Sequence, residues 1–380
     1  MSNKSNLRRI ITIASIAVAT IVAILFFTLG GFNKTQEPVS NQQPVSGQLN
    51  ISVLLPSTGP AATFSTYSKQ GFDWALSDIR KEYGDKLSIS YEDTQTNPKV
   101  GVTLYNKVTT TEKPKVIIVL LSSVTKAIKP LLDRKSMVIA SAVATPGISD
   151  PSKFLFRVFA SSNEVAQKAS EYILKKEKNT ASVIYVNDEY GVGSMTSFKQ
   201  KYESGGGKVV DVEPFSLTEK DFRTQWQKTI KNKPSALWIT GYGPGYVTVL
   251  TQLREFSYEG LIVVDWTITA PEYLEATSGV KNGTVVVTPV ITQEFQKLYE
   301  EKFGKAGYMV NVGYSYDAIK MIWNAYSKSD GSVESIAKNF SSINDFKGAT
   351  GDIVVLPSGD ITAKYQLNQL QDKKVLPLEN

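Results

Sequence analysis

The chain has 380 residues, and its 42 Lys and Arg against 36 Asp and Glu give a formal net charge of +6. It contains neither His nor Cys, which excludes Ser–His and Cys–His nucleophile pairs, zinc sites built on thiolate or imidazole, and disulfides. Carboxylate pairs, lysine nucleophiles and oxygen-ligated Mg²⁺ or Ca²⁺ stay open. Because Lys and Glu are interspersed along the predicted helices instead of forming a basic stripe, we expect no nucleic-acid partner.

The N-terminal segment is strongly apolar. Residues 10–28 are 19 residues without a charge, which as a helix would span ~28 Å, close to the ~30 Å hydrocarbon core of a bilayer. Lys4, Arg8 and Arg9 precede this run, and the positive-inside rule places them in the cytoplasm. The alternative is a cleaved signal peptide, although the run is longer than usual and lacks an Ala-x-Ala site. We therefore expect residues 1–32 to be a membrane anchor or a signal peptide, with the body on the extracytoplasmic side.

Residues 33–49 are polar, contain Pro, Ser and Gln throughout, and show no periodicity. Such a composition is typical of a flexible linker, whose r.m.s. span would be ~20–25 Å. A body on this linker stays beside the membrane.

From residue 50 onward, short apolar runs alternate with amphipathic stretches of helical period. Strands separated by helices of 10–15 residues predict βαβ units and parallel sheets, and runs such as VIIVLL are typical of strands buried on both faces. About 330 residues exceed one comfortable core, so two domains are expected. The predicted strands are residues 51–55, 87–91, 116–121, 137–140, 182–186, 208–212, 236–240, 261–264 and 284–287.

Ligands of open α/β sheets bind beyond the carboxyl ends of the strands, so the strand-to-helix loops matter most. These loops are rich in Ser, Thr, Gly and Tyr and poor in charge, which favours a binding cleft over acid–base chemistry. Their glycine clusters lack both the GxGxxG pattern and a Walker lysine, so we expect no nucleotide cofactor. The loops are residues 56–66, 121–125, 141–149, 187–193, 241–245 and 265–271.

Several segments in and around these loops carry a resemblance. They are LLPSTGPAATFSTYSKQGFDWAL, YEDTQTNP, VIYVNDEYGVGSMTSFKQKYESGGGKVV, FSLTEKDFRTQWQKTIKNKPSALWITGYGPG and YSYDAIKMI. In this order and spacing the chain, from about residue 51 to 316, resembles the amino-acid-binding family of type I periplasmic binding proteins. These leucine-binding-protein-like chains are the substrate-binding components of branched-chain amino acid ABC transporters, with relatives that bind amides, urea or aromatic acids.

The resemblance implies two Rossmann-like α/β lobes that are joined by a three-segment hinge and close on a ligand. Lobe 1 would comprise residues 50–160 and about 290–340. Lobe 2 would comprise residues 161–289 and about 341–380. It also implies a small-molecule ligand, an ABC permease partner in the membrane, and no cofactor or metal.

The family's ligand contacts transfer to several positions. Phe64 falls where members place an aromatic ring against the ligand. Ser122 and Ser123 fall in the loop that holds the ligand's α-carboxylate, and Tyr190 and Tyr242 match tyrosines that close over it. The residues alone leave alternatives open. Both serines also suit the cap of a helix starting near residue 125, Phe64 suits loop packing, and Tyr190 suits packing at a helix start.

Asp265 lies near the family's acidic ligand for the α-ammonium, and it is equally suited to capping a local helix. One departure affects ligand choice. The family's small-small-hydroxyl triplet reads Ala142-Val143-Ala144 here, with Thr145 one place later. Ala142 and Ala144 are expected at the ligand, but a hydroxyl donor for the carboxylate is lost. The substitution favours a differently shaped ligand such as an amide.

The sequence leaves three possible functions to be tested. The first is capture of a small polar molecule, an amino acid of branched-chain type or a related amide, for an ABC importer. The alternative is a sensor ectodomain that signals through a membrane partner. An enzyme acting through carboxylates is disfavoured, because no acidic pair lies on adjacent cleft loops beyond Asp188/Glu189 and Asp265. We therefore expect no catalytic residues.

Overall fold

The computed structural model describes residues 47–277, 280, 282–304 and 307–378. The predicted membrane anchor and all but the last three residues of the predicted linker lie outside the described residues. Within the described ranges, no helix is both long enough and apolar enough to cross a membrane.

Lobe 1 is built on a five-stranded sheet in which all strands are parallel, in the order β2-β1-β3-β4-β5. Its central strands are fully buried, as their unbroken apolar sequences predict. The strands are β1 (Leu49–Leu55), β2 (Leu87–Asp93), β3 (Val116–Leu120), β4 (Met137–Ser141) and β5 (Leu155–Val158).

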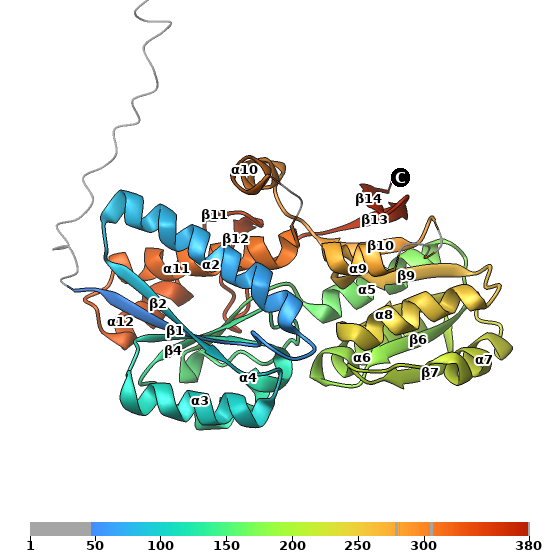
Figure 1. Cartoon of the computed structure of the whole chain (residues 1–380), viewed down its shortest axis with the longest axis horizontal. Coiled ribbons are helices and arrows are strands. Elements are labelled where there is room, and N and C mark those ends of the chain that lie inside the picture. Colours follow the sequence, from blue (N-terminus) through green and yellow to red (C-terminus); the bar gives the residue numbers. More distant parts are fainter. Residues whose placement is uncertain (1–46, 278–279, 281, 305–306, 379–380) are drawn as a thin grey trace, which may run out of the picture. The chain divides into compact units, whose positions relative to one another are not determined.

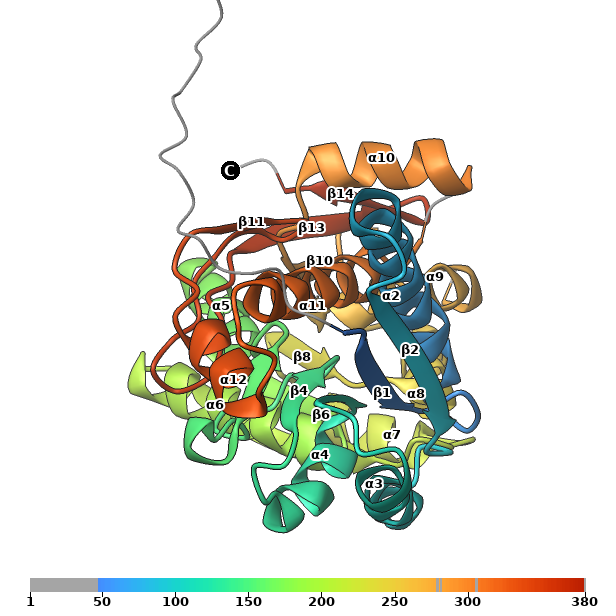
Figure 2. The same ribbon diagram turned by 90° about the vertical axis from the view of Figure 1, so that its left-hand side faces the viewer.

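Helices cover both faces of this sheet. α2 and α11 pack against each other on one face, and α3 and α4 pack together on the other (Figures 1 and 2). α12 packs on α11. These helices are α2 (Ala62–Tyr83), α3 (Pro98–Thr111), α4 (Ser122–Ile128), α11 (Met309–Ser327) and α12 (Val333–Ser341), and short 3-10 helices follow at Lys129–Leu131 and Pro151–Lys153.

Lobe 2 is built on a seven-stranded sheet in the order β14-β13-β10-β9-β8-β6-β7. β6 to β10 are parallel and repeat the strand order of lobe 1, whereas β13 and β14 add an antiparallel edge. The strands are β6 (Thr180–Val186), β7 (Lys208–Phe215), β8 (Ala236–Thr240), β9 (Leu261–Asp265), β10 (Val285–Pro289), β13 (Tyr365–Gln371) and β14 (Lys374–Pro377).

The helices of lobe 2 pack against its parallel strands and against one another. α5 packs against α6 and contacts β9 and β10, while α7 and α8 contact β7 (Figure 1). The helices are α5 (Ser162–Lys175), α6 (Glu189–Ser204), α7 (Arg223–Lys231), α8 (Gly243–Gln252) and α9 (Pro271–Ala276), with 3-10 helices at Leu253–Glu255 and Trp266–Thr269. α10 (Gln293–Phe303) follows β10 and packs on α2 of lobe 1, where the ring of Phe295 lies 4.7 Å from that of Trp74.

The chain passes between the two sheets three times: after β5, after β10 and before β13. The first and third passages are tied by a buried ion pair, in which Arg157 Nε lies 2.9 Å from Asp360 Oδ1. Arg157 also donates to the carbonyls of Phe159 and Ala160, where the chain leaves lobe 1. The guanidinium therefore fixes the backbone at the first passage.

A short hairpin, β11 (Phe346–Gly348) and β12 (Gly351–Ile353), precedes the third passage. Its turn is held by the buried carboxylate of Asp317 on α11, which accepts from the backbone N–H of Ala349 at 2.7 Å and of Thr350 at 2.9 Å. This hairpin thus lies against lobe 1. The exact division of the chain into lobes stays a prediction.

The α/β class and the parallel sheets are confirmed, and every predicted strand is present. β5 was missed because its four residues, LFRV, are too short for a pattern and include the buried Arg157. β11, β12 and β14 were missed because they have only three or four residues each, and β13 because its sequence, YQLNQLQ, is mostly polar. α2 begins at Ala62, so the end of the predicted loop 56–66 is helical.

Candidate ligand-binding site

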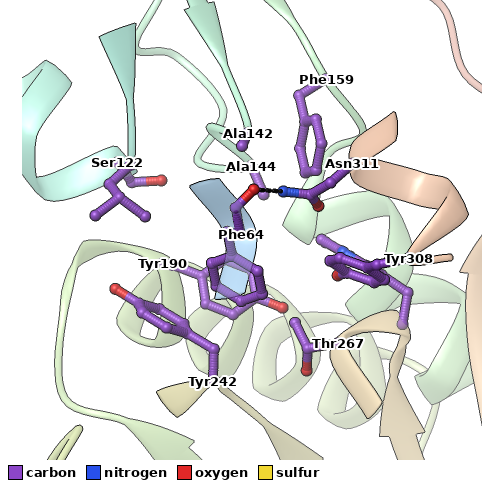
Figure 3. Close-up of a pocket in the computed structure, with 12 residues that line it drawn as sticks. Phe64, Ser122, Ala142, Ala144, Phe159, Tyr190, Tyr242, Thr267, Tyr308 and Asn311 are labelled. Atoms are coloured by element: carbon purple, nitrogen blue, oxygen red, sulfur yellow. Dashed lines mark hydrogen bonds between the residues drawn. The ribbon is translucent and has the colours of Figure 1, made fainter. Parts of the chain in front are cut away.

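A cavity lies at the carboxyl ends of the strands of both sheets, where the strand order reverses. Its walls come from both lobes and from the N-terminus of α11 (Figure 3). The lining residues are Phe64, Leu121, Ser122, Ala142, Ala144, Phe159, Tyr190, Tyr242, Trp266, Thr267, Tyr308 and Asn311.

The lobe 1 wall includes two residues of strained backbone. Leu121, directly after β3, has φ 72°, and Ala142, directly after β4, has φ 51°. Side chains other than glycine avoid this region at a cost of about 1–3 kcal/mol each, and such residues cluster at ligand sites. The turn at Leu121 places Ser122 at the first position of α4, where its side chain lines the cavity and no described residue bonds to its hydroxyl.

The lobe 2 wall is formed by residues that follow β6, β8 and β9. Tyr242 is the extended residue before α8, and Gly243 after it has φ 81°. A Cβ at Gly243 would lie 3.0 Å from the backbone carbonyl oxygen of Leu217, so glycine lets the chain turn here while Tyr242 faces the cavity. Trp266 and Thr267 open the 3-10 helix after β9.

Aromatic rings from the two lobes meet across the cavity. The ring of Phe64, from lobe 1, lies 5.2 Å from that of Tyr242 and 5.8 Å from that of Tyr308. The ring of Tyr190 lies 6.0 Å from that of Tyr242 and 5.9 Å from that of Trp266. These contacts give the cavity apolar walls that can pack on a ligand's body.

Asp265 lies behind the aromatic wall and is fully buried. One carboxylate oxygen accepts from the Tyr190 hydroxyl at 2.6 Å, the Thr240 hydroxyl at 2.7 Å and the Gly241 N–H at 3.0 Å. The other accepts from Thr267, through its backbone N–H at 3.0 Å and its hydroxyl. Burial raises the pKa of Asp265, while the hydrogen bonds from Thr267, Tyr190 and Thr240 act in the opposite direction. With both oxygens used, this carboxylate orients the cavity wall.

Asp188 supports the wall in the same way. It caps α6 by accepting from the Gly191 N–H at 3.0 Å, and its other oxygen accepts from the Tyr242 hydroxyl at 2.5 Å. Burial raises the pKa of Asp188, and burial together with the nearby carboxylate raises that of Tyr242. Each cavity tyrosine of lobe 2 therefore has its hydroxyl anchored to a carboxylate.

The cavity offers hydrogen-bonding groups without charge. None of the described residues that line it is Asp, Glu, Lys or Arg. Its side-chain polar groups are hydroxyls, an indole and the Asn311 carboxamide. Such a site can bind and orient a small molecule, while it places no titrating acid or base directly on it.

Two polar contacts join the lobes beside the cavity. Lys126 Nζ on α4 lies 2.7 Å from Glu189 Oε1 on α6. The Tyr67 hydroxyl on α2 donates to Glu272 Oε1 on α9 at 3.0 Å. In this structure the two lobes are therefore in contact with each other.

Six of the eight residues expected at the ligand line this cavity: Phe64, Ser122, Ala142, Ala144, Tyr190 and Tyr242. Ser123 and Asp265 are not among its lining residues. The capping alternative for the two serines was wrong, because α4 starts at Ser122 and its cap, Leu121, makes no side-chain bond. Asp265 does cap the 3-10 helix that follows it, through the Thr267 N–H.

Other lining residues were not anticipated. Trp266 and Thr267 come within two residues of the end of β9, a positional signal that the sequence carried. Phe159 directly follows β5, whose short sequence gave no strand signal. Tyr308 and Asn311 gave no such signal, because they precede or open a helix that reaches the cavity only through the passage after β10.

A family model described as "Periplasmic binding protein" matches residues 48–374. The chain belongs to this family. The match covers every element that lines the cavity and every strand of both sheets except most of β14.

Individual relatives are distant in sequence and similar in fold. The Leu/Ile/Val-binding protein homolog 3 of Brucella melitensis is 22% identical over 345 residues, covering 87% of this chain and 94% of the relative. A leucine-binding protein of Thermotoga maritima superposes with a TM-score of 0.81 at 23% identity, over 87% of this chain and 98% of that one. The branched-chain amino acid transporter substrate-binding protein of Streptococcus pneumoniae, solved with isoleucine, gives a TM-score of 0.78 at 17% identity, over 86% and 97%.

Proposed function

We propose that this protein captures a small polar molecule, an amino acid or a related amide, outside the cytoplasm and delivers it to an ABC permease. The observation that carries the proposal is the cavity between the sheets, with uncharged polar groups and aromatic rings contributed by both lobes. The names of the relatives, which bind Leu, Ile and Val, support an amino-acid-like ligand. The uncharged lining favours binding over catalysis.

Capture would follow from closure. Phe64 and Ser122 belong to lobe 1, whereas Tyr190 and Tyr242 belong to lobe 2. A ligand that contacts all four binds the closed arrangement better than an open one and shifts the population toward it. The Lys126–Glu189 pair adds a contact that only the closed form makes.

The proposal extends to location. Residues 10–28 would anchor the chain in the membrane, or be cleaved on export, and residues 33–49 would tether the body. A tethered body stays within reach of a permease, which would receive the ligand when the lobes open.

Thermal unfolding of the full-length chain in detergent tests the proposal. It should be measured against amino acids, amides and small carboxylates. A ligand at 100 times its Kd stabilises the folded state by ~2.7 kcal/mol. Tyr242→Ala should abolish this stabilisation, while the control Tyr83→Ala, at an exposed site on α2, should retain it. A panel in which no compound stabilises the wild type would refute the capture function.

A further inference from the structure

We infer that the captured molecule carries an uncharged hydrogen-bond donor, a hydroxyl or a carboxamide N–H, on the end that faces Asn311. The ligand would then be a polar uncharged amino acid or amide instead of a branched aliphatic one. This inference rests on the proposed capture function and narrows its ligand class.

Asn311 lies in the first turn of α11 and is 2% exposed, yet its side chain lines the cavity. Its Nδ2 donates to the Phe64 carbonyl at 3.4 Å and to the Ser68 hydroxyl at 3.1 Å (Figure 3). A backbone carbonyl can only accept, so the amide nitrogen must face Phe64. The orientation of the carboxamide is therefore fixed by the protein.

That orientation leaves an acceptor for the ligand. No described residue donates a hydrogen bond to Asn311 Oδ1, although both hydrogens of Nδ2 have acceptors. A buried acceptor is costly when it loses water without gaining a partner, so a bound molecule that meets Oδ1 with a methyl group is penalised. A ligand hydroxyl or N–H at this place would complete the site.

The position of Asn311 indicates which part of the ligand it meets. Ser122 and Asn311 lie on opposite sides of the cavity, with Phe64 between them (Figure 3). If Ser122 holds the α-carboxylate, the α-ammonium is bonded to the neighbouring carbon and stays near that side. The group that reaches Asn311 is then the end of the ligand's side chain.

Leucine and asparagine form a matched pair of probes, because their side chains have nearly the same shape and differ in two methyls against a carboxamide. A site built to hydrogen-bond a ligand group discriminates strongly against an analogue that lacks it. We expect isothermal titration of the full-length chain in detergent to give a Kd for asparagine at least tenfold below that for leucine. Asn311→Leu should remove or reverse this preference.

The matched control is Asn106→Leu, which makes the same replacement at an exposed position on α3 and should leave the preference unchanged. Leucine binding as tightly as asparagine to the wild type would overturn the inference and leave capture intact. An unchanged preference in a folded Asn311→Leu, checked by circular dichroism, would overturn the role of Asn311. If that variant does not fold, the wild-type ratio decides alone. Binding of neither probe, nor of glutamine, threonine or a simple amide such as acetamide, would overturn the inference even if another compound binds.

Discussion

Replacing Asp265 by Asn separates a supporting role of this residue from direct contact with the ligand. Its two oxygens accept from Tyr190, Thr240, Gly241 and Thr267, all without access to water. An amide has a single acceptor oxygen, and its NH₂ would face donors that need an acceptor. One backbone N–H, of Gly241 or of Thr267, loses its acceptor, and the neighbouring hydroxyls must reorient to accept from the NH₂. At ~1–3 kcal/mol for each group affected, we expect a loss of stability of about 3 kcal/mol.

For a body of ~330 residues, 3 kcal/mol corresponds to a fall in Tm of about 4 °C. The exposed Asp345→Asn should change stability by less than ~0.5 kcal/mol. Because Tyr190 and Thr267 line the cavity, Asp265→Asn should also weaken every ligand by about tenfold, whether or not it carries an amine. Urea unfolding and calorimetry measure the two effects. Unchanged stability, with binding lost for amine-bearing ligands alone, would refute the supporting role and make Asp265 a direct ligand.

Three further outcomes follow. Burial raises the pKa of Asp317 from 3.8 to about 6 in the folded state. The folded protein then binds this proton more tightly than the unfolded chain, so its advantage over Asp317→Asn in urea unfolding should grow by about 2–3 kcal/mol between pH 7 and pH 4; a flat difference would contradict this. Lys126→Ala removes the exposed pair with Glu189 and should weaken ligand binding by at most about fivefold at low salt and not at 1 M NaCl; equal losses at both salt concentrations would exclude an electrostatic contact. Gly191→Ala would place a Cβ against the backbone of β6 and should destabilise the protein by more than 1 kcal/mol in thermal melts, whereas Gly193→Ala, whose Cβ would have only a side-chain oxygen at 3.9 Å, should be neutral or stabilising; similar effects of both would refute the argument.

Strands with strong apolar sequences could be predicted from the sequence because burial on both faces leaves no room for polar residues. VIIVL and ALWIT are such strands, and both are fully buried. Strands that pair because of the surrounding fold, and not because of their own composition, could not be predicted from the sequence. β13 pairs antiparallel to β10 at the end of the chain, and nothing in its alternating polar sequence distinguishes it from an exposed segment.

The residues of the candidate site also fall into those that the sequence could predict and those that it could not. Tyr190 and Tyr242 could be predicted because parallel strands place their carboxyl-terminal loops at one edge. Asn311 could not, since its approach depends on α11 packing against α2 after the chain has returned from lobe 2. The position of Asp265 behind the cavity wall also could not be predicted from the sequence and became visible only in the structure. An aspartate at a strand end looks the same in sequence whether it faces a ligand or is covered by donors of four neighbouring residues.

The buried carboxylates of Asp265 and Asp188 explain how a polar cavity can both capture a ligand and release it. Asp265 and Asp188 hold their tyrosines by short hydrogen bonds, so the walls are ordered before a ligand arrives and less conformational entropy is lost on binding. Because the ligand meets tyrosine rings and uncharged donors, it forms no buried ion pair with the lining residues that would have to be broken on release. The backbone strain at Leu121 and Ala142 keeps adjacent loop ends at the cavity, at a cost that the buried strands β3 and β4 beneath them can support. A protein that hands its ligand to a partner needs ordered walls and a ligand that can leave, and an uncharged lining held by buried carboxylates favours both.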